Sequence, residues 1–133
     1  MRTILLASCL TGLLVVFCRP GFAADCTDGN QMQLSQCAAQ AASSADRTMN
    51  TLYQQLLKKI DPDSQQRLRA AQRAWIAYRD RECLFRTGGG PDQGGSIWPM
   101  INAQCLQTLT DSRNHDLAAQ LKCQSWDLSC PAN

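Results

Sequence analysis

The sequence predicts an all-α fold, a small three-helix bundle cross-linked by disulfides. Apolar residues recur every three or four positions over three separate stretches, which is the period of one face of an α-helix. No stretch alternates apolar and polar residues as a half-buried β-strand does. Six cysteines lie in the chain that follows an apolar N-terminal segment, and an even number in so small an exported chain predicts three disulfides.

The first predicted helix begins with a capping signal. Asn30 followed by Gln33 fits a capping box, in which each side chain bonds the backbone amide of the other residue. The apolar face that follows consists of Leu34, Ala38, Ala41, Ala45, Met49, Leu52, Leu56 and Ile60.

The second predicted helix opens at Asp61-Pro62, an acidic cap followed by proline at the first helical position. Its spacing predicts a buried stripe with Glu82 as the one polar interruption. The members of that stripe are Leu68, Ala71, Trp75, Tyr78, Glu82 and Phe85.

A glycine-rich loop separates the second helix from the third. The run Gly-Gly-Gly-Pro-Asp-Gln-Gly-Gly at 88–95 cannot continue a helix. Ser96 is the expected cap of the third helix, and Pro99 falls in the first turn, where proline is tolerated. The apolar face of this helix carries Ile101, Cys105, Leu109, Leu117 and Leu121.

Residues 1–23 are predicted to be a secretory signal peptide. Arg2 precedes an apolar run, and Gly21-Phe22-Ala23 supplies the small residues that a signal peptidase recognises. Cleavage after Ala23 leaves 24–133 as a single domain with a short C-terminal tail at 123–133. The apolar run is shorter than the roughly 20 residues of a spanning helix, so we expect a bacterial periplasmic or secreted protein without a membrane span.

Charge and composition exclude several classes of function. Arg2 and Arg19 leave with the signal peptide, so eleven of the thirteen basic residues remain against eleven acidic ones and the mature net charge is zero. Bulk charge therefore indicates neither a nucleic-acid partner nor a membrane surface. No phosphate-binding loop occurs, because 88–95 lacks the lysine and hydroxyl residue of that motif, and we expect no cofactor.

The six mature cysteines are better explained by disulfides than by a metal. No C-x-x-C pair occurs and His115 is the one histidine, whereas zinc sites use closely spaced pairs. Antiparallel helices would place Cys83 opposite both Cys37 and Cys105, so geometry leaves its partner open. Cys26 could reach Cys37 or Cys105. Cys123 and Cys130 are close enough in sequence to close a small loop in the tail.

The most distinctive stretch is Ala70-Ala71-Gln72-Arg73-Ala74-Trp75-Ile76-Ala77-Tyr78-Arg79-Asp80-Arg81-Glu82-Cys83. It resembles the signature of the N-terminal domain family of the lysozyme inhibitor LprI, a family of small secreted bacterial proteins. The resemblance spans roughly Cys26 to Leu121. Further matching positions are Asp46, Met49, Asn50, Tyr53, Gly94, Gly95, Ser96, Cys105, Leu109 and Arg113.

The resemblance has implications for the disulfides and for function. It favours the pairs Cys26–Cys37, Cys83–Cys105 and Cys123–Cys130 over the alternative of Cys37–Cys83 with Cys26–Cys105. It implies a non-enzymatic binding protein that inhibits lysozyme. The alternative function is a structural or stress-related cell-envelope protein that binds another periplasmic protein or cell-wall material. The oligomeric state stays open.

Most residues of the family motif have a structural interpretation. Trp75 and Tyr78 are expected in the core, and Arg79-Asp80 is expected to form salt bridges, with Asp46 or Asp111 as the interhelical partner. Buried polar groups need partners, so we expect Asn50 and Tyr53 to form hydrogen bonds between helices. Arg113 belongs to the same structural group.

The candidate binding residues lie in the loop end at 88–96, with Asp92 near its apex. Loops held by a rigid scaffold often carry binding residues, although an ordinary flexible link is the alternative. The other candidates there are Gly94, Gly95 and Ser96. We expect no catalytic residues, because His115 lies on a polar helix face and no free thiol remains.

Overall fold

The computed structural model describes residues 26–124, 126–128 and 130, so the predicted signal peptide at 1–23 lies outside the described residues. No strand occurs in the part described, and the predicted all-α fold with disulfides is confirmed. None of the described helices combines the length and the apolarity needed to cross a membrane. The helices, in order, are α1 (Gln31–Lys59), α2 (Pro62–Arg86), the short α3 (Pro91–Gly94), a 3₁₀ turn η1 (Gly95–Ile97) and α4 (Trp98–Leu121).

Two of the three predicted caps are confirmed. Asn30 Oδ1 accepts from the Gln33 amide at 3.0 Å, and Gln33 Oε1 accepts from the Asn30 amide at 2.9 Å. Asp61 Oδ1 accepts from the amides of the first turn of α2. The expected cap at Ser96 is wrong, because η1 runs directly into α4 and the chain is already helical at Ile97, where no side chain caps the helix. A capping side chain needs extended backbone at its own position.

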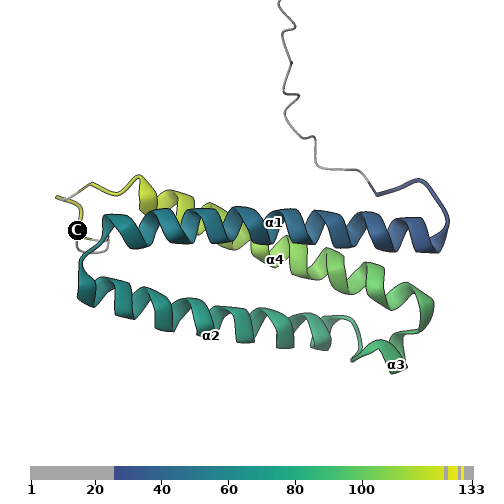
Figure 1. Ribbon diagram of the computed structural model, residues 1–133. Coiled ribbons are helices and arrows are strands. Elements are labelled where there is room, and N and C mark those ends of the chain that lie inside the picture. The colour runs from purple at the N-terminus through teal and green to yellow at the C-terminus, as the bar shows by residue number, and fades with distance from the viewer. Residues whose placement is uncertain (1–25, 125, 129, 131–133) are drawn as a thin grey trace, which may run out of the picture.

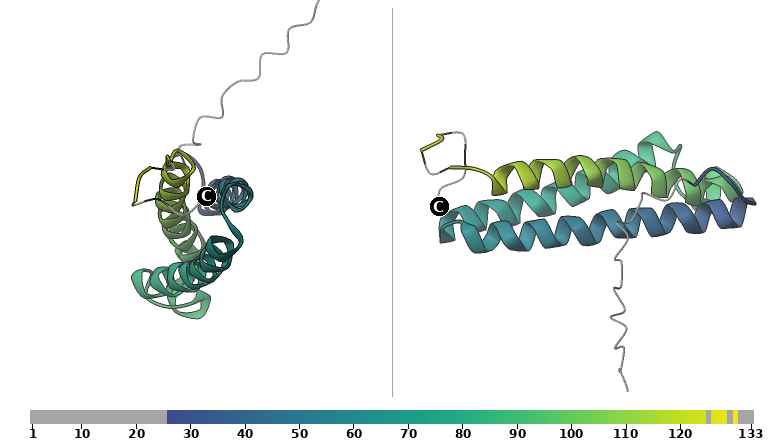
Figure 2. Two further views of the ribbon diagram at one scale, coloured as in Figure 1. Left: turned by 90° about the vertical axis from the view of Figure 1, so that its left-hand side faces the viewer. Right: turned by 90° about the horizontal axis from the view of Figure 1, so that it is seen from above.

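α1 and α4 run in the same direction and share by far the largest helix interface (Figures 1 and 2). Ala38, Ala45 and Ala103 are buried there, and such small side chains allow two helices to approach closely. α2 runs in the opposite direction and lies further from α1. The three long helices α1, α2 and α4 thus form a close α1–α4 pair with α2 packed more loosely against it, a distinction that the predicted three-helix bundle did not contain.

The main apolar core lies at the end of the molecule where α1 turns into α2. Leu56 and Leu117 are the largest apolar side chains there with almost no exposed surface, at 1% and 0%. Lys59 Nζ donates to the carbonyls of Leu121 and Cys123, at 2.7 and 3.1 Å, and so satisfies the C-terminal end of α4. The core cluster comprises Met49, Leu56, Leu57, Ile60, Leu68 and Leu117, with Leu52, Tyr53, Trp75 and Leu121 packed against it.

The predicted buried stripe of α2 is wrong in half of its members. Leu68 is buried and Trp75 half-buried, but Tyr78 and Phe85 are 52% and 81% exposed, and Ala71 is exposed as well. The face that turns inward is set by polar contacts and by a disulfide, which apolar spacing does not reveal. Its buried members are Ser64, Leu68, Gln72, Arg79 and Cys83.

The structure forms the disulfides Cys26–Cys37, Cys83–Cys105 and Cys123–Cys130. The first two lie at the end of the molecule where α1 begins, α2 ends and α4 begins (Figure 1). The third closes a seven-residue loop in the tail beyond α4. The alternative pairing of Cys37 with Cys83 is not the one formed.

Candidate functional site

The connection between α2 and α4 is more ordered than the flexible link that was considered. It contains α3 and η1, and it forms the corner of the molecule in Figure 1. We call residues 84–97 the loop end; this range adds the last residues of α2, Thr87 and Ile97 to the predicted segment 88–96. Gly88, Gly89 and Gly95 adopt positive φ angles of 76°, 111° and 61°, which side chains other than glycine rarely tolerate.

Hydrogen bonds within the loop end fix its shape. Gln93 Oε1 accepts from the Gly90 amide at 2.7 Å. Trp98 Nε1 donates to the Gly89 carbonyl, also at 2.7 Å, and so ties the loop to the first residue of α4. A Cβ atom at Gly94 would collide with the Trp98 side chain, so this position requires glycine.

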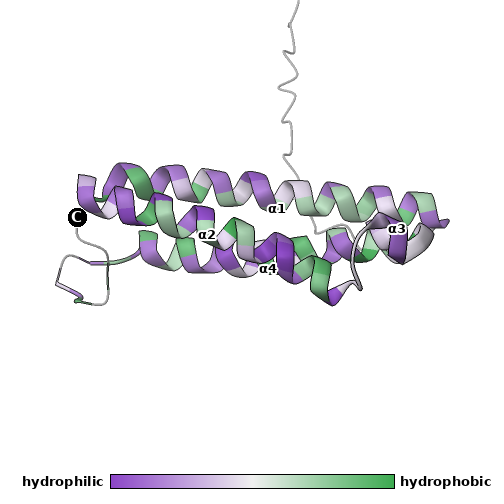
Figure 3. Ribbon diagram, turned by 90° about the horizontal axis from the view of Figure 1, so that it is seen from below, coloured by the Kyte–Doolittle hydropathy of each residue, from purple (hydrophilic) through white to green (hydrophobic). Residues whose placement is uncertain are grey.

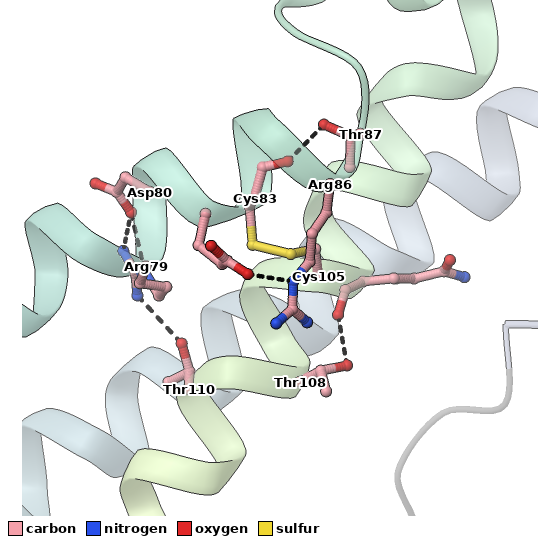
Figure 4. The surroundings of a disulfide bond; sticks show 10 residues. Arg79, Asp80, Cys83, Arg86, Thr87, Cys105, Thr108 and Thr110 are labelled. Atoms are coloured by element: carbon pink, nitrogen blue, oxygen red, sulfur yellow. Dashed lines mark hydrogen bonds and ion pairs between the residues drawn. A yellow bond between two sulfur atoms is a disulfide. The ribbon is translucent and has the colours of Figure 1, made fainter.

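The disulfide between Cys83 and Cys105 holds both stems of the loop end (Figure 4). The Cys83 side chain is fully buried, and its carbonyl accepts from the Thr87 hydroxyl at 2.7 Å. Arg86 Nε pairs with Glu82 Oε1 at 2.7 Å on the last turn of α2. The loop end is therefore presented on a restrained base.

Three large apolar side chains of the loop end are exposed. Leu84, Phe85 and Ile97 are 43%, 81% and 47% exposed. Asp92 is exposed in the same segment and forms no ion pair with any residue the structure describes. Leu84 and Phe85 are consecutive in α2, and contiguous exposed apolar surface is typical of interaction sites.

The loop end contains all four predicted binding residues, with Asp92, Gly95 and Ser96 exposed and Gly94 half-buried. Sequence reasoning missed the three apolar side chains beside them. Phe85 was assigned to the core on spacing alone. The seven-residue spacing places Phe85 on the same side of α2 as Tyr78 but does not indicate whether that side is buried.

The family-motif arginine lies between the helices, not on the surface. Arg79 Nη1 pairs with Asp46 of α1 at 2.7 Å and donates to the Thr110 hydroxyl of α4 at 3.1 Å. Its Nη2 pairs with Asp80 at 2.9 Å. Arg79 thus joins all three long helices, and of the two interhelical partners considered for it, Asp46 is the one used.

Two guanidinium groups lie over the Trp75 ring. Arg79 and Arg113 lie 5.4 and 5.9 Å from its ring centroid, within the range of cation–π attraction. Arg113 Nε donates to Gln72 at 3.1 Å, and Gln72 Nε2 donates to the Met49 sulfur at 3.2 Å. Burial lowers the pKa of Arg113, while Asp116 acts in the opposite direction. These contacts give the motif a structural role.

The expected interhelical hydrogen bonds of Asn50 and Tyr53 do not form. Asn50 is exposed, and Tyr53 packs against the apolar cluster. Neither side chain bonds any residue within the described ranges. The connection between α1 and α4 at this level is made instead by Asn114 Nδ2, which donates to the Ala45 carbonyl at 3.1 Å.

Groups that could support catalysis are few in the described part of the chain. His115 is 86% exposed, and its Nδ1 lies 3.9 Å from Asp116. The six cysteines of that part are all in disulfides. No cluster of three or more metal-ligating side chains occurs among residues 26–124, 126–128 and 130. What the described molecule does offer at the loop end is an exposed surface on a restrained base.

Comparison with known proteins gives a family. The model of the family described as lysozyme inhibitor LprI matches residues 23–117. An uncharacterized protein of Rhizobium meliloti (strain 1021) is 33% identical over 101 residues, which cover 66% of this chain and 71% of that protein. No solved structure matches. Because the family model covers well over half of the sequence, this chain belongs to the LprI lysozyme inhibitor family.

Proposed function

We propose that this protein is an exported, non-enzymatic binding protein that inhibits lysozyme through its loop end. The observation that carries the proposal is the family match over residues 23–117. The exposed apolar side chains of the loop end, held by a disulfide and by the Trp98 indole, support it as the contact surface.

Restraint favours inhibition because binding must order whatever is mobile in the free protein. Each flexible side chain or loop residue fixed on binding costs free energy, so a loop that already has its bound shape binds more tightly. The Cys83–Cys105 disulfide and the bond from Trp98 to Gly89 provide this restraint before any contact is made.

Local charge is the second feature that favours binding to lysozyme. Animal lysozymes are strongly basic, and an acidic group opposite a basic partner raises the association rate. The net charge expected of the mature chain is zero, so attraction has to come from a local carboxylate. Asp92 is exposed in the loop end and is the carboxylate best placed for this role.

An extracytoplasmic location completes the proposal, with residues 1–23 as the signal peptide and 24–133 as the exported domain. Three disulfides are typical of a protein that folds in an oxidising compartment, such as the periplasm or the exterior of the cell. Lysozyme acts on the cell wall in the same compartments.

A turbidity assay of lysozyme on bacterial cells tests the proposal. The purified protein is expected to slow lysis, and Asp92→Lys is expected to weaken this protection. Asp111→Lys is the matched control, since it makes the same charge change at an exposed position on α4. Absence of protection at excess protein, with both animal and phage lysozymes, would exclude inhibition. Equal potency of the two variants would exclude the loop end as the site.

A further inference from the structure

The outer face of α2 carries an ordered pattern of exposed side chains. Three neighbouring rows run along it with seven-residue spacing, which is close to two turns of helix. All nine side chains are exposed, and Figure 3 shows hydrophilic and hydrophobic residues intermixed on this helix. The rows are Ala70, Ala77 and Leu84; Arg67, Ala74 and Arg81; and Ala71, Tyr78 and Phe85. We call these nine residues the outer ridge.

Arg81 is the unpaired cation of this ridge near the loop end. The two carboxylates of α2 that flank it in sequence are already used, because Asp80 pairs with Arg79 at 2.9 Å and Glu82 with Arg86 at 2.7 Å. Arg81 itself forms no hydrogen bond or ion pair in the described part of the chain. Its guanidinium is therefore free to bind an anion.

Two exposed rings flank Arg81 on the same side of the helix. Tyr78 precedes it by three residues and Phe85 follows it by four, and side chains at these spacings are neighbours on a helix surface. The rings are 52% and 81% exposed. A projecting cation between aromatic side chains is complementary to a recess that has carboxylates at its floor and apolar walls.

The catalytic cleft of a glycoside hydrolase has this chemistry. Two carboxyl groups flank the scissile bond, about 5 Å apart in retaining enzymes. Guanidinium is planar and offers parallel N–H donors, so it binds carboxylates with two bonds at once. We propose that Arg81 enters the cleft of lysozyme and pairs with its catalytic carboxylates, with Tyr78 and Phe85 against the walls. This inference rests on the proposed inhibition of lysozyme and extends the contact surface from the loop end along α2 to Arg81 and Tyr78.

The pattern of the ridge disfavours two other occupants. In an antiparallel pair of two copies centred on Ala74, each Arg67 would face the partner's Arg81, and like charges placed opposite each other repel. On a membrane surface the central row would lie deepest, whereas arginines at such surfaces keep their charged ends at the edge of the apolar region. A carboxylate-lined cleft satisfies both the central cation and the flanking rings.

The test measures binding of the purified protein to lysozyme and to a lysozyme variant whose two catalytic carboxylates are replaced by amides. Arg81→Gln is expected to weaken binding to intact lysozyme roughly 30-fold, as the loss of one partner of a desolvated charge pair does. It is expected to change binding to the amide variant less than twofold. Arg73→Gln is the matched control, because Arg73 is also exposed and forms no ion pair with a described residue, but lies outside the three rows.

The outcomes separate this inference from the proposed function. If the unsubstituted protein neither binds nor inhibits lysozyme, both fail. A second result is that the unsubstituted protein inhibits lysozyme, while Arg81→Gln binds intact lysozyme just as tightly or loses the same affinity for intact lysozyme and for the amide variant. In either case the cleft contact is wrong and the proposed inhibition stands. Dimerisation that Arg81→Gln abolishes, without an effect on lysozyme binding, would overturn the contact in favour of a second copy. Equal thermal midpoints of the variants show that binding, not folding, has changed.

Discussion

The two faces of α2 reverse the usual relation between polarity and burial. On the inner face Gln72 and Arg79 are only 6% and 9% exposed, whereas on the outer face Tyr78 and Phe85 are 52% and 81% exposed. The two faces lie on one 25-residue helix, so neither intrinsic helix propensity nor position in the chain explains the difference. The inner polar groups have partners on α1 and α4, and the outer rings have none among the described residues.

The comparison shows that burial on this helix depends on available partners. Burying a polar group is costly only when its hydrogen bonds are left unmade. Arg79 keeps bonds to Asp46, Asp80 and Thr110, and Gln72 both accepts from Arg113 and donates to Met49. The Gln72 and Arg79 side chains are long, whereas alanines lie between α1 and α4. The long side chains therefore hold α2 at a greater distance from α1 than the distance between α4 and α1.

The largest effect is expected where the inner face is covalently fixed. Replacing Cys83 and Cys105 together by serine should lower the free energy of unfolding by about 3 kcal/mol, because the bond closes a 22-residue loop and Cys83 is fully buried. Urea denaturation measures this. The double serine variant of Cys123 and Cys130, in the tail, should lose less. Equal losses would show that the disulfide does not secure α2.

Removal of the central inner cation should have the next largest effect. Arg79→Met leaves the Asp46 carboxylate and the Thr110 hydroxyl without their shared partner, and we expect a loss of about 2 kcal/mol. Arg81→Met makes the same chemical change on the outer face, where the expected loss is below about 0.5 kcal/mol. Similar losses in denaturant titrations of the two variants would contradict the distinction between the faces.

The sequence predicts well whatever depends on neighbouring residues. The cap at Asn30, the turn at Asp61-Pro62 and the apolar face of α1 follow from local patterns, and the structure confirms them. The orientation of α2 does not follow, because it depends on an ion pair between Arg79 and Asp46, which are 33 positions apart. Periodicity counts Tyr78 and Phe85 as apolar without regard to whether another helix lies opposite them.

The candidate site shows the same division. Glycine and proline predict a break in the helix at 88–95, and α2 ends at Arg86, just before this segment. The short helix α3 and the bond from Trp98 to Gly89 depend on contacts across the loop, so they could not be predicted from composition. The expected bonds of Asn50 and Tyr53 failed for a similar reason, since the interhelical contact at that level is made by Asn114.

A smaller, pH-dependent effect is expected at the start of α2. Hydrogen bonds from the Ser64 hydroxyl and amide hold the pKa of Asp61 below its ordinary value of 3.8. A lowered pKa in the folded state means that the ionised cap stabilises the fold above the unfolded-state pKa, and that this contribution is lost as the pH falls through the folded-state pKa. Asp61→Ala should therefore lower the thermal midpoint at pH 7 and approach the unsubstituted protein in acid. Asp61→Asn also lacks the titrating carboxyl but keeps a neutral cap, so its thermal midpoint should depend on pH as that of Asp61→Ala does and lie above it. A difference between Asp61→Ala and the unsubstituted protein that stays constant down to pH 2 would contradict this prediction.

The smallest effect on stability should come from the two largest exposed rings. If Tyr78 and Phe85 were core residues, as their spacing suggests, replacing each would cost about 3 kcal/mol, because large apolar side chains lose both transfer free energy and packing. On the outer face, the double substitution Tyr78→Ser with Phe85→Ser should change the free energy of unfolding by less than about 0.5 kcal/mol. The same variant should lose lysozyme inhibition, since the rings flank Arg81. Unchanged stability with lost inhibition would assign the outer face to binding. A large loss of stability would instead show that both rings pack as core residues do and would contradict the prediction.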